Sequence, residues 1–136
     1  MIPCVRVKPT VDIDLLTPAV IRILSALDLA ARQHGVELTV TCGRDGHPPG
    51  DPHTRGAALD VRTSNLTPDL TIRVYHYLRS VLGDLFTVLY EGPVAPANGA
   101  LANIATVNPG ATACHFHVQV LKGTVYPPQD DTTTAA

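Results

Sequence analysis

The segment HFHVQV (residues 115–120) alternates strictly between polar and apolar side chains. Because successive side chains of a β-strand point to opposite faces, His115, His117 and Gln119 share one face and the intervening apolar residues share the other. The pattern predicts a strand that packs one face against a hydrophobic core. It also places two imidazoles next to each other on the opposite, polar face.

A second segment, AALDV (residues 57–61), shows the same division. Asp60 lies on its polar face, and two apolar residues share the other. If both strands belong to one sheet, Asp60 and the histidines of residues 115–120 converge on one cleft. His53 lies seven residues before Asp60 on a loop rich in glycine and proline (residues 43–56), and it can fold over that cleft.

Two imidazoles and one carboxylate form a ligand set that suits zinc. Three protein ligands leave a fourth position for water, which distinguishes a catalytic zinc site from a structural one. An isolated histidine is more often an ordinary surface or core residue, so the paired histidines carry this hypothesis. An HxH pair also occurs in metal-binding β-barrels, but the glutamate and glycine spacing expected there is absent from this sequence.

Two helices are predicted from the residues at their ends. Thr17-Pro18 and Thr67-Pro68 each combine an N-cap threonine with a proline at the first helical position. Apolar residues follow each pair at three- and four-residue steps. Gly35 and Gly83 then provide the residue type that commonly ends a helix.

The order of the elements predicts an α+β fold. Besides the two strands described above, strands are expected at residues 2–7, 36–42 and 85–91. Two helices among four or five strands favour a mostly antiparallel sheet that is covered by both helices on one face. The zinc cleft is then expected on the other face.

The length of the chain predicts a single domain, which we expect to cover residues 1–125. Within it, residues 92–114 show no clear period and are expected to form a long, mobile loop beside the metal. Residues 126–136 are expected to be a disordered tail.

Composition and charge argue against several classes of partner. The formal charge of −2 gives no electrostatic footprint for nucleic acid or for an anionic membrane. No apolar run approaches the ~20 residues that a membrane span needs. The N-terminus MIPCVRVKPT lacks the apolar stretch of a signal peptide, so we expect synthesis in the cytoplasm. Three cysteines without a CxxC spacing are typical of a reduced protein, although one disulfide remains compatible with the sequence.

The segment HTRGAALD (residues 53–60) resembles the HxxGxAxD motif of the zinc D-alanyl-D-alanine peptidase superfamily. Relatives in that superfamily include phage endolysins, murein endopeptidases and the signalling domain of hedgehog proteins. The hedgehog branch fits best, because HTRGAALDVRTS resembles its HYEGRAVDITTS and HFHVQV resembles its HIHCSV. FTVLYEG also resembles its strand that ends in a glutamate, and the order of elements agrees over residues 17–121.

The resemblance implies that His53, Asp60 and His117 are the zinc ligands. It implies that Glu91 is the general base that accepts a proton from zinc-bound water. In hedgehog domains and many peptidases this glutamate lies a few residues before the last histidines, whereas 23 residues separate Glu91 from His115 here. Glu91 therefore needs strand pairing to reach the site, and it could instead be an ordinary glutamate at a strand end.

Two further roles follow from the same resemblance. His115 would stabilise the developing oxyanion or assist proton transfer, and Arg44 would steady the carbonyl or carboxylate of the substrate. Arg44 could equally be a solvated loop arginine. Cys114 is left out of the site, because its side chain should point away from the histidines. The acidic cluster that binds calcium in animal hedgehogs is largely missing around residues 41–46, so no calcium is expected.

These expectations together describe a zinc metallopeptidase of the DD-carboxypeptidase or endopeptidase type. Its substrate would be a peptidoglycan peptide, and its place of action the cell wall, both as implications of the resemblance alone. The alternative is a non-catalytic, hedgehog-like zinc module that binds a partner protein or a cell-wall ligand. A purely structural zinc domain is a weaker alternative, because only three good ligands are present.

Overall fold

Six strands form one sheet in the computed structural model, which describes residues 3–12, 16–43 and 57–128. Their order in the sheet is β1-β2-β3-β6-β4-β5. The inner pairs are antiparallel, whereas each edge strand runs parallel to its neighbour. The strand bounds are β1 (Cys4–Val7), β2 (Glu37–Cys42), β3 (Ala58–Arg62), β4 (Phe86–Gly92), β5 (Ala105–Val107) and β6 (His115–Val120). The predicted α+β class with a mostly antiparallel sheet is confirmed.

Helices α1 (Pro18–His34) and α2 (Pro68–Leu82) begin and end where the sequence predicts. The hydroxyl oxygens of Thr17 and Thr67 each accept a hydrogen bond from the backbone N–H three residues later, at 3.2 Å. Gly35 and Gly83 follow the helices with φ of 65° and 72°, values that glycine adopts without a steric penalty. A short 3-10 turn (Gly83–Leu85) leads from α2 into β4.

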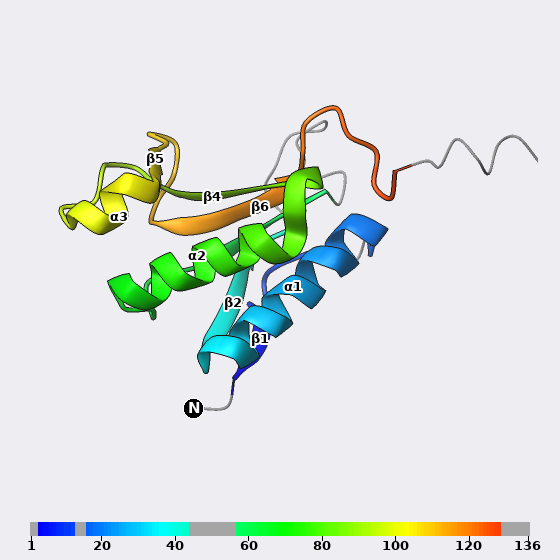
Figure 1. Cartoon of the computed structure of the whole chain (residues 1–136), viewed down its shortest axis with the longest axis horizontal. Helices are drawn as coiled ribbons and strands as arrows, with labels where there is room; N and C mark the ends of the chain where they lie inside the picture. The colour runs from blue at the N-terminus through cyan, green and yellow to red at the C-terminus, as the bar shows by residue number, and fades with distance from the viewer. Residues whose placement is uncertain (1–2, 13–15, 44–56, 129–136) are drawn as a thin grey trace, which may run out of the picture.

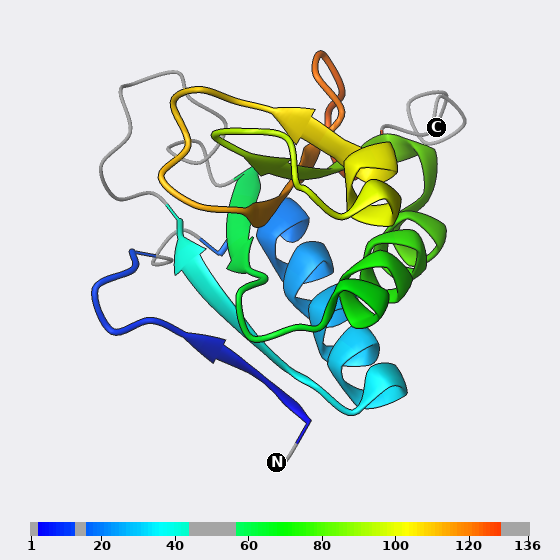
Figure 2. The same ribbon diagram turned by 90° about the vertical axis from the view of Figure 1, so that its left-hand side faces the viewer.

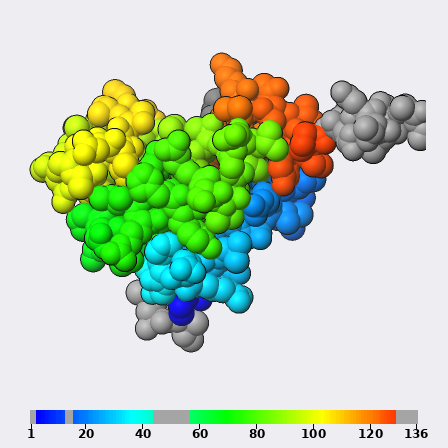
Figure 3. All heavy atoms as spheres, in the orientation of Figure 1, coloured from blue at the N-terminus to red at the C-terminus, as the bar shows by residue number. Residues whose placement is uncertain are grey.

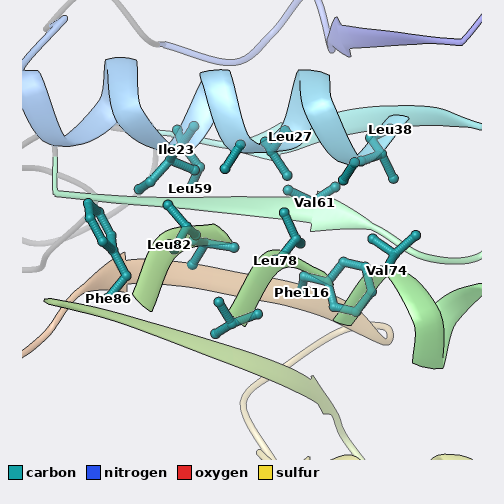
Figure 4. Close-up of a cluster of buried hydrophobic side chains, with 14 of the residues drawn as sticks. Ile23, Leu27, Leu38, Leu59, Val61, Val74, Leu78, Leu82, Phe86 and Phe116 are labelled. Atoms are coloured by element: carbon teal, nitrogen blue, oxygen red, sulfur yellow. The ribbon is translucent and has the colours of Figure 1, made fainter. Parts of the chain in front are cut away.

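Helices α1 and α2 lie on the same side of the sheet (Figures 1 and 2). Apolar side chains from both helices meet those of the central strands in one core (Figure 4). Its fully buried members include Ile23, Leu27, Val74, Leu78, Leu59, Val61 and Phe116. Because side chains alternate along β3 and β6, burying this apolar set leaves the polar residues of the same strands on the opposite face of the sheet.

The segment 92–114 differs from the expected long loop, because part of it has regular structure. Helix α3 (Gly99–Ile104) is capped by the side chain of Asn98, which accepts a hydrogen bond from Leu101 N–H at 3.1 Å. Strand β5 follows directly and extends the sheet beside β4. Both elements are too short to show a period in the sequence. In the space-filling view, this segment lies at one end of α2 (Figure 3, yellow).

The packed domain continues past residue 125, where the disordered tail was expected to begin. The ring of Tyr126 packs edge-on against Phe86, with the ring centroids 5.0 Å apart. This contact helps to cover Phe86, which is buried at the start of β4. Residues 129–136 of the expected tail lie outside the described residues.

Two other sequence expectations concern the helices and the cysteines. No helix within the described ranges has both the length and the apolar character needed to cross a bilayer. No disulfide joins the three cysteines, all of which the structure describes.

Gly92 provides a test of how tightly the ends of β4 and β6 pack. A Cβ atom added to Gly92 would lie 2.5 Å from Sγ of Cys114 and 3.4 Å from its Cα. We therefore expect Gly92→Ala to lower the free energy of unfolding by about 1–3 kcal/mol, measured by urea denaturation. The same substitution should cost less in a Cys114→Ala background, because the clashing sulfur is absent. If Gly92→Ala lowers the free energy of unfolding equally in the two backgrounds, the contact with Cys114 is not what excludes a side chain at residue 92.

Candidate functional site

The register of β6 with its two neighbours brings four predicted site residues together. His117 lies directly opposite Asp60 of β3, and His115 lies directly opposite Glu91 of β4. Directly opposed residues of an antiparallel pair share a face of the sheet. Two carboxylates and two imidazoles therefore gather on the face that the helices leave uncovered.

Asp60 and His117 are in hydrogen-bonding contact. Nδ1 of His117 lies 2.8 Å from Oδ1 of Asp60. The other ring nitrogen, Nε2, lies 2.5 Å from the side-chain oxygen of Gln119. Both nitrogens of this imidazole therefore face oxygen atoms that accept hydrogen bonds.

Glu91 and His115 form a second contact beside the first. Nε2 of His115 donates to Oε1 of Glu91 at 3.0 Å and lies 3.8 Å from Oδ1 of Asp60. The opposite ring nitrogen, Nδ1, faces the backbone carbonyl oxygen of Ala113 at 3.0 Å. The separation of 23 residues along the chain is thus bridged by strand pairing, and the expected approach of Glu91 to the histidines is confirmed.

The four side chains are largely but not fully buried. Their exposed fractions run from 11% for Glu91 to 17% for His115. Groups at this depth are held by their neighbours and can still be reached from solvent. This combination suits a site that positions a small molecule or an ion.

The surroundings of His117 favour a positive charge. Burial by itself lowers the pKa of this imidazole, because it penalises the charged form. The hydrogen bonds to Asp60 and Gln119 and the negative charges of Asp60 and Glu91 outweigh burial, so the pKa of His117 is raised above its ordinary value. The oxygen atoms that stabilise an imidazolium here would also favour a bound cation.

A pocket of about 720 Å³ opens over these residues. The four site residues line it, together with Lys8 beyond β1 and the turn 108–112 that follows β5. Asn108 holds that turn against β4, because its N–H donates to the carbonyl oxygen of Gly92 at 2.8 Å. The segment 92–114 therefore borders the site, and it does so as a structured segment that contains α3 and β5 rather than as an irregular loop.

The remaining predicted site residues are placed as follows. His53 and Arg44 lie outside the described residues, as does Gly56 of the HxxGxAxD motif. Within the described ranges, no three His, Cys, Asp or Glu side chains are arranged to hold a metal ion. Asp60 and His117 are the two expected ligands that the structure places in contact.

Cys114 lies on the core side of the sheet, as expected. Its thiol contacts the hydroxyl of Tyr90, and its carbonyl oxygen accepts a hydrogen bond from Thr63 at 3.1 Å. Tyr90 packs against Phe116 in the core, with ring centroids 5.9 Å apart. These residues support the ends of β4 and β6 from behind the site.

Several pocket residues had no role in the sequence interpretation, among them Lys8, Asn108 and Gln119. Lys8 and Asn108 lack a local signal, because each enters the pocket only through the folding of a distant segment. Gln119 did have a local signal in the sequence, because it continues the alternation of His115 and His117 on the same face of the strand. An amide at that position could have been recognised as a partner for the nearer imidazole.

Comparison with known proteins gives no match to a protein-family model, to a curated protein or to a solved structure. The relationship to hedgehog domains and DD-peptidases therefore remains a proposal. It rests on the sequence motifs and on the arrangement of the site residues.

Tyr90 gives a pH-dependent test of the packing behind the site. Burial, followed by the hydrogen bond and charge of Cys114, raises the pKa of Tyr90 from 10.0 to about 12. Because the pKa is higher in the folded state, this stabilising contribution is complete below pH 10.0 and is lost as the pH rises through about 12.

The expected result is that one tyrosine ionises only near pH 12, measured by tyrosinate absorbance. Tyr90→Phe should remove the ionisation at high pH and leave the ionisation of the other tyrosines unchanged. Ionisation of Tyr90 near pH 10.0 in the folded protein would contradict the packing described here.

Proposed function

We propose that this chain is a zinc-dependent peptidase that hydrolyses amide bonds of cell-wall peptides. The observation that carries the proposal is the contact of Glu91 with His115, directly beside the contact of Asp60 with His117. Together with the HxxGxAxD and HxH motifs, it supports a catalytic centre of the DD-peptidase type. The polar face of the sheet would be the substrate cleft.

The chemistry of the donor atoms fits zinc. A carboxylate oxygen and an imidazole nitrogen are both preferred zinc ligands, and Asp60 and His117 present them 2.8 Å apart. His53, which lies outside the described residues, would be the third ligand. When bound, zinc would lower the pKa of water and polarise the carbonyl group of the substrate.

Glu91 is suited to proton transfer. Glu91 lines the pocket, where its carboxylate can accept a proton from the attacking water and pass it to the leaving amine. The hydrogen bond from His115 fixes the position of one carboxylate oxygen. The second oxygen is then available for the water.

His115 is suited to stabilise the negative charge that develops on the carbonyl oxygen. Its Nε2–H points into the space between Glu91 and Asp60. The hydrogen bond that this group donates can switch from Glu91 to an oxyanion. Arg44, which lies outside the described residues, would add a positive charge near the carbonyl or carboxylate of the substrate, as expected from the resemblance.

The pocket also supports a peptide as the substrate. A volume of about 720 Å³ accommodates a short peptide segment. Among the described residues that line it, Lys8 is the one lysine or arginine. A carboxylate near the scissile bond, such as a peptide C-terminus, would find its counter-ion there. This feature supports the carboxypeptidase type.

The second candidate function is a non-catalytic zinc module that binds a partner protein or a cell-wall ligand. The contact between Glu91 and His115 also favours this alternative, because it occupies an oxygen of the intended base. Counted with its backbone, the whole Glu91 residue is only 9% exposed. A site of this kind could hold zinc and a ligand without turnover.

The first prediction for this function concerns metal content. Protein purified without added zinc should contain about one equivalent of zinc per chain, because two histidines and one aspartate form a complete ligand set. Asp60→Ala and His117→Ala should each lose most of it. Cys114→Ala is the matched control and should keep its zinc, since that side chain lies on the core side of the sheet. Full zinc content in both ligand variants would refute the ligand set.

The second prediction separates proton transfer from metal binding. Glu91→Gln keeps the shape and most hydrogen bonding of the side chain but removes its charge. We expect this variant to keep its zinc and to hydrolyse peptidoglycan peptides about 100- to 10,000-fold more slowly, measured by chromatography of the products. Glu37→Gln, on β2 and paired with exposed Arg6, is the control and should retain wild-type activity.

The outcomes distinguish the two functions. If the Glu91→Gln variant hydrolyses peptides at the wild-type rate, another group is the base, and His115 would be the first to test. A wild-type protein that binds zinc but cleaves no peptidoglycan peptide would support the binding module.

A further inference from the structure

We propose that Gln119 is a positioning residue that determines which ring nitrogen of His117 holds the metal. The inference rests on the metal site of the proposed function and is independent of whether that site hydrolyses peptides. Gln119 lies within the segment HFHVQV, but the resemblance assigns it no role. The argument comes from two contacts of the His117 imidazole and one contact of the Gln119 amide.

The orientation of the Gln119 amide is set from both ends. Its nitrogen donates to the backbone carbonyl oxygen of Val120 at 3.4 Å. Its oxygen is thereby directed at Nε2 of His117, 2.5 Å away. An amide oxygen can only accept a hydrogen bond, so Nε2 must carry a hydrogen atom in this arrangement.

This contact leaves Nδ1 as the nitrogen that can bind a cation. A neutral imidazole carries one N–H, and its other nitrogen offers a lone pair. With the hydrogen atom on Nε2, the lone pair lies on Nδ1, which is 2.8 Å from Oδ1 of Asp60. A cation held by both atoms would replace the proton between them, and that proton would leave to solvent.

The alternative nitrogen fits poorly. The two ring nitrogens of His117 point in different directions, one toward Asp60 and the other toward Gln119. A metal on Nε2 would have to displace the Gln119 oxygen, and it would be turned away from the only other expected ligand that lies in contact with His117 among the described residues. A hydrogen bond from the second nitrogen of a metal-binding histidine commonly fixes its tautomer and strengthens the ligand.

Two variants test this role by zinc affinity, measured by competition with a chromophoric chelator. Gln119→Leu removes the acceptor at similar side-chain size and should weaken zinc binding about 10- to 100-fold. Gln119→Glu restores an acceptor oxygen and should recover most of that loss. Thr87→Val is the control, because Thr87 lies opposite Gln119 in the β4–β6 register and has no described contact with His117.

A spectroscopic measurement tests the nitrogen directly. With an NMR-active cadmium isotope in place of zinc and isotope-labelled histidine, the metal should show scalar coupling to Nδ1 of His117. Nε2 should remain protonated. A structural role for Gln119 would not predict which nitrogen couples.

The inference is overturned if cadmium couples to Nε2 of His117, or if Gln119→Leu binds zinc as tightly as the wild type. If Gln119→Leu does not fold, the coupling in the wild type decides. Zinc binding without any effect of Gln119 refutes this inference alone. A wild type that binds no zinc refutes the proposed function as well.

Discussion

The pairing of β6 with β3 on one side and β4 on the other is the interaction on which the candidate site depends. Strand β6 pairs with β3 along one edge and with β4 along the other, so both neighbours fix its register. A slip of one residue would move Phe116 and Val118 from the core to the polar face. The hydrophobic core under α1 and α2 therefore helps to hold the imidazoles in place, together with their own hydrogen bonds.

Much of this arrangement could be predicted from the sequence because its signals are local. Each Thr-Pro pair starts a helix by satisfying backbone groups within one turn, and Gly35 ends one by accepting a positive φ. The alternation in β3 and β6 gave the correct faces for Asp60 and His117. Helix α3 and β5 were missed, because six and three residues are too few to display a period.

The chemistry of the site could be predicted only in part, since contacts between distant strands have no local signature. The sequence alone could not show that Glu91 lies opposite His115, because any strand-end glutamate has the same local pattern. The position of Lys8 depends on β1 joining the sheet in parallel beside β2. The role of Gln119 depends on a side-chain orientation, which strand alternation leaves open.

The connection between β4 and β6 has a further consequence for how such a site can diversify. The connection from Gly92 to His115 begins and ends at neighbouring positions, so its ends stay together whatever lies between them. Doubling the length of such a connection costs only about 0.6 kcal/mol of chain entropy when the connection is flexible. Insertions and deletions between these strands can therefore reshape one wall of the pocket, while the carboxylate of Glu91 and the imidazole of His115 keep their separation.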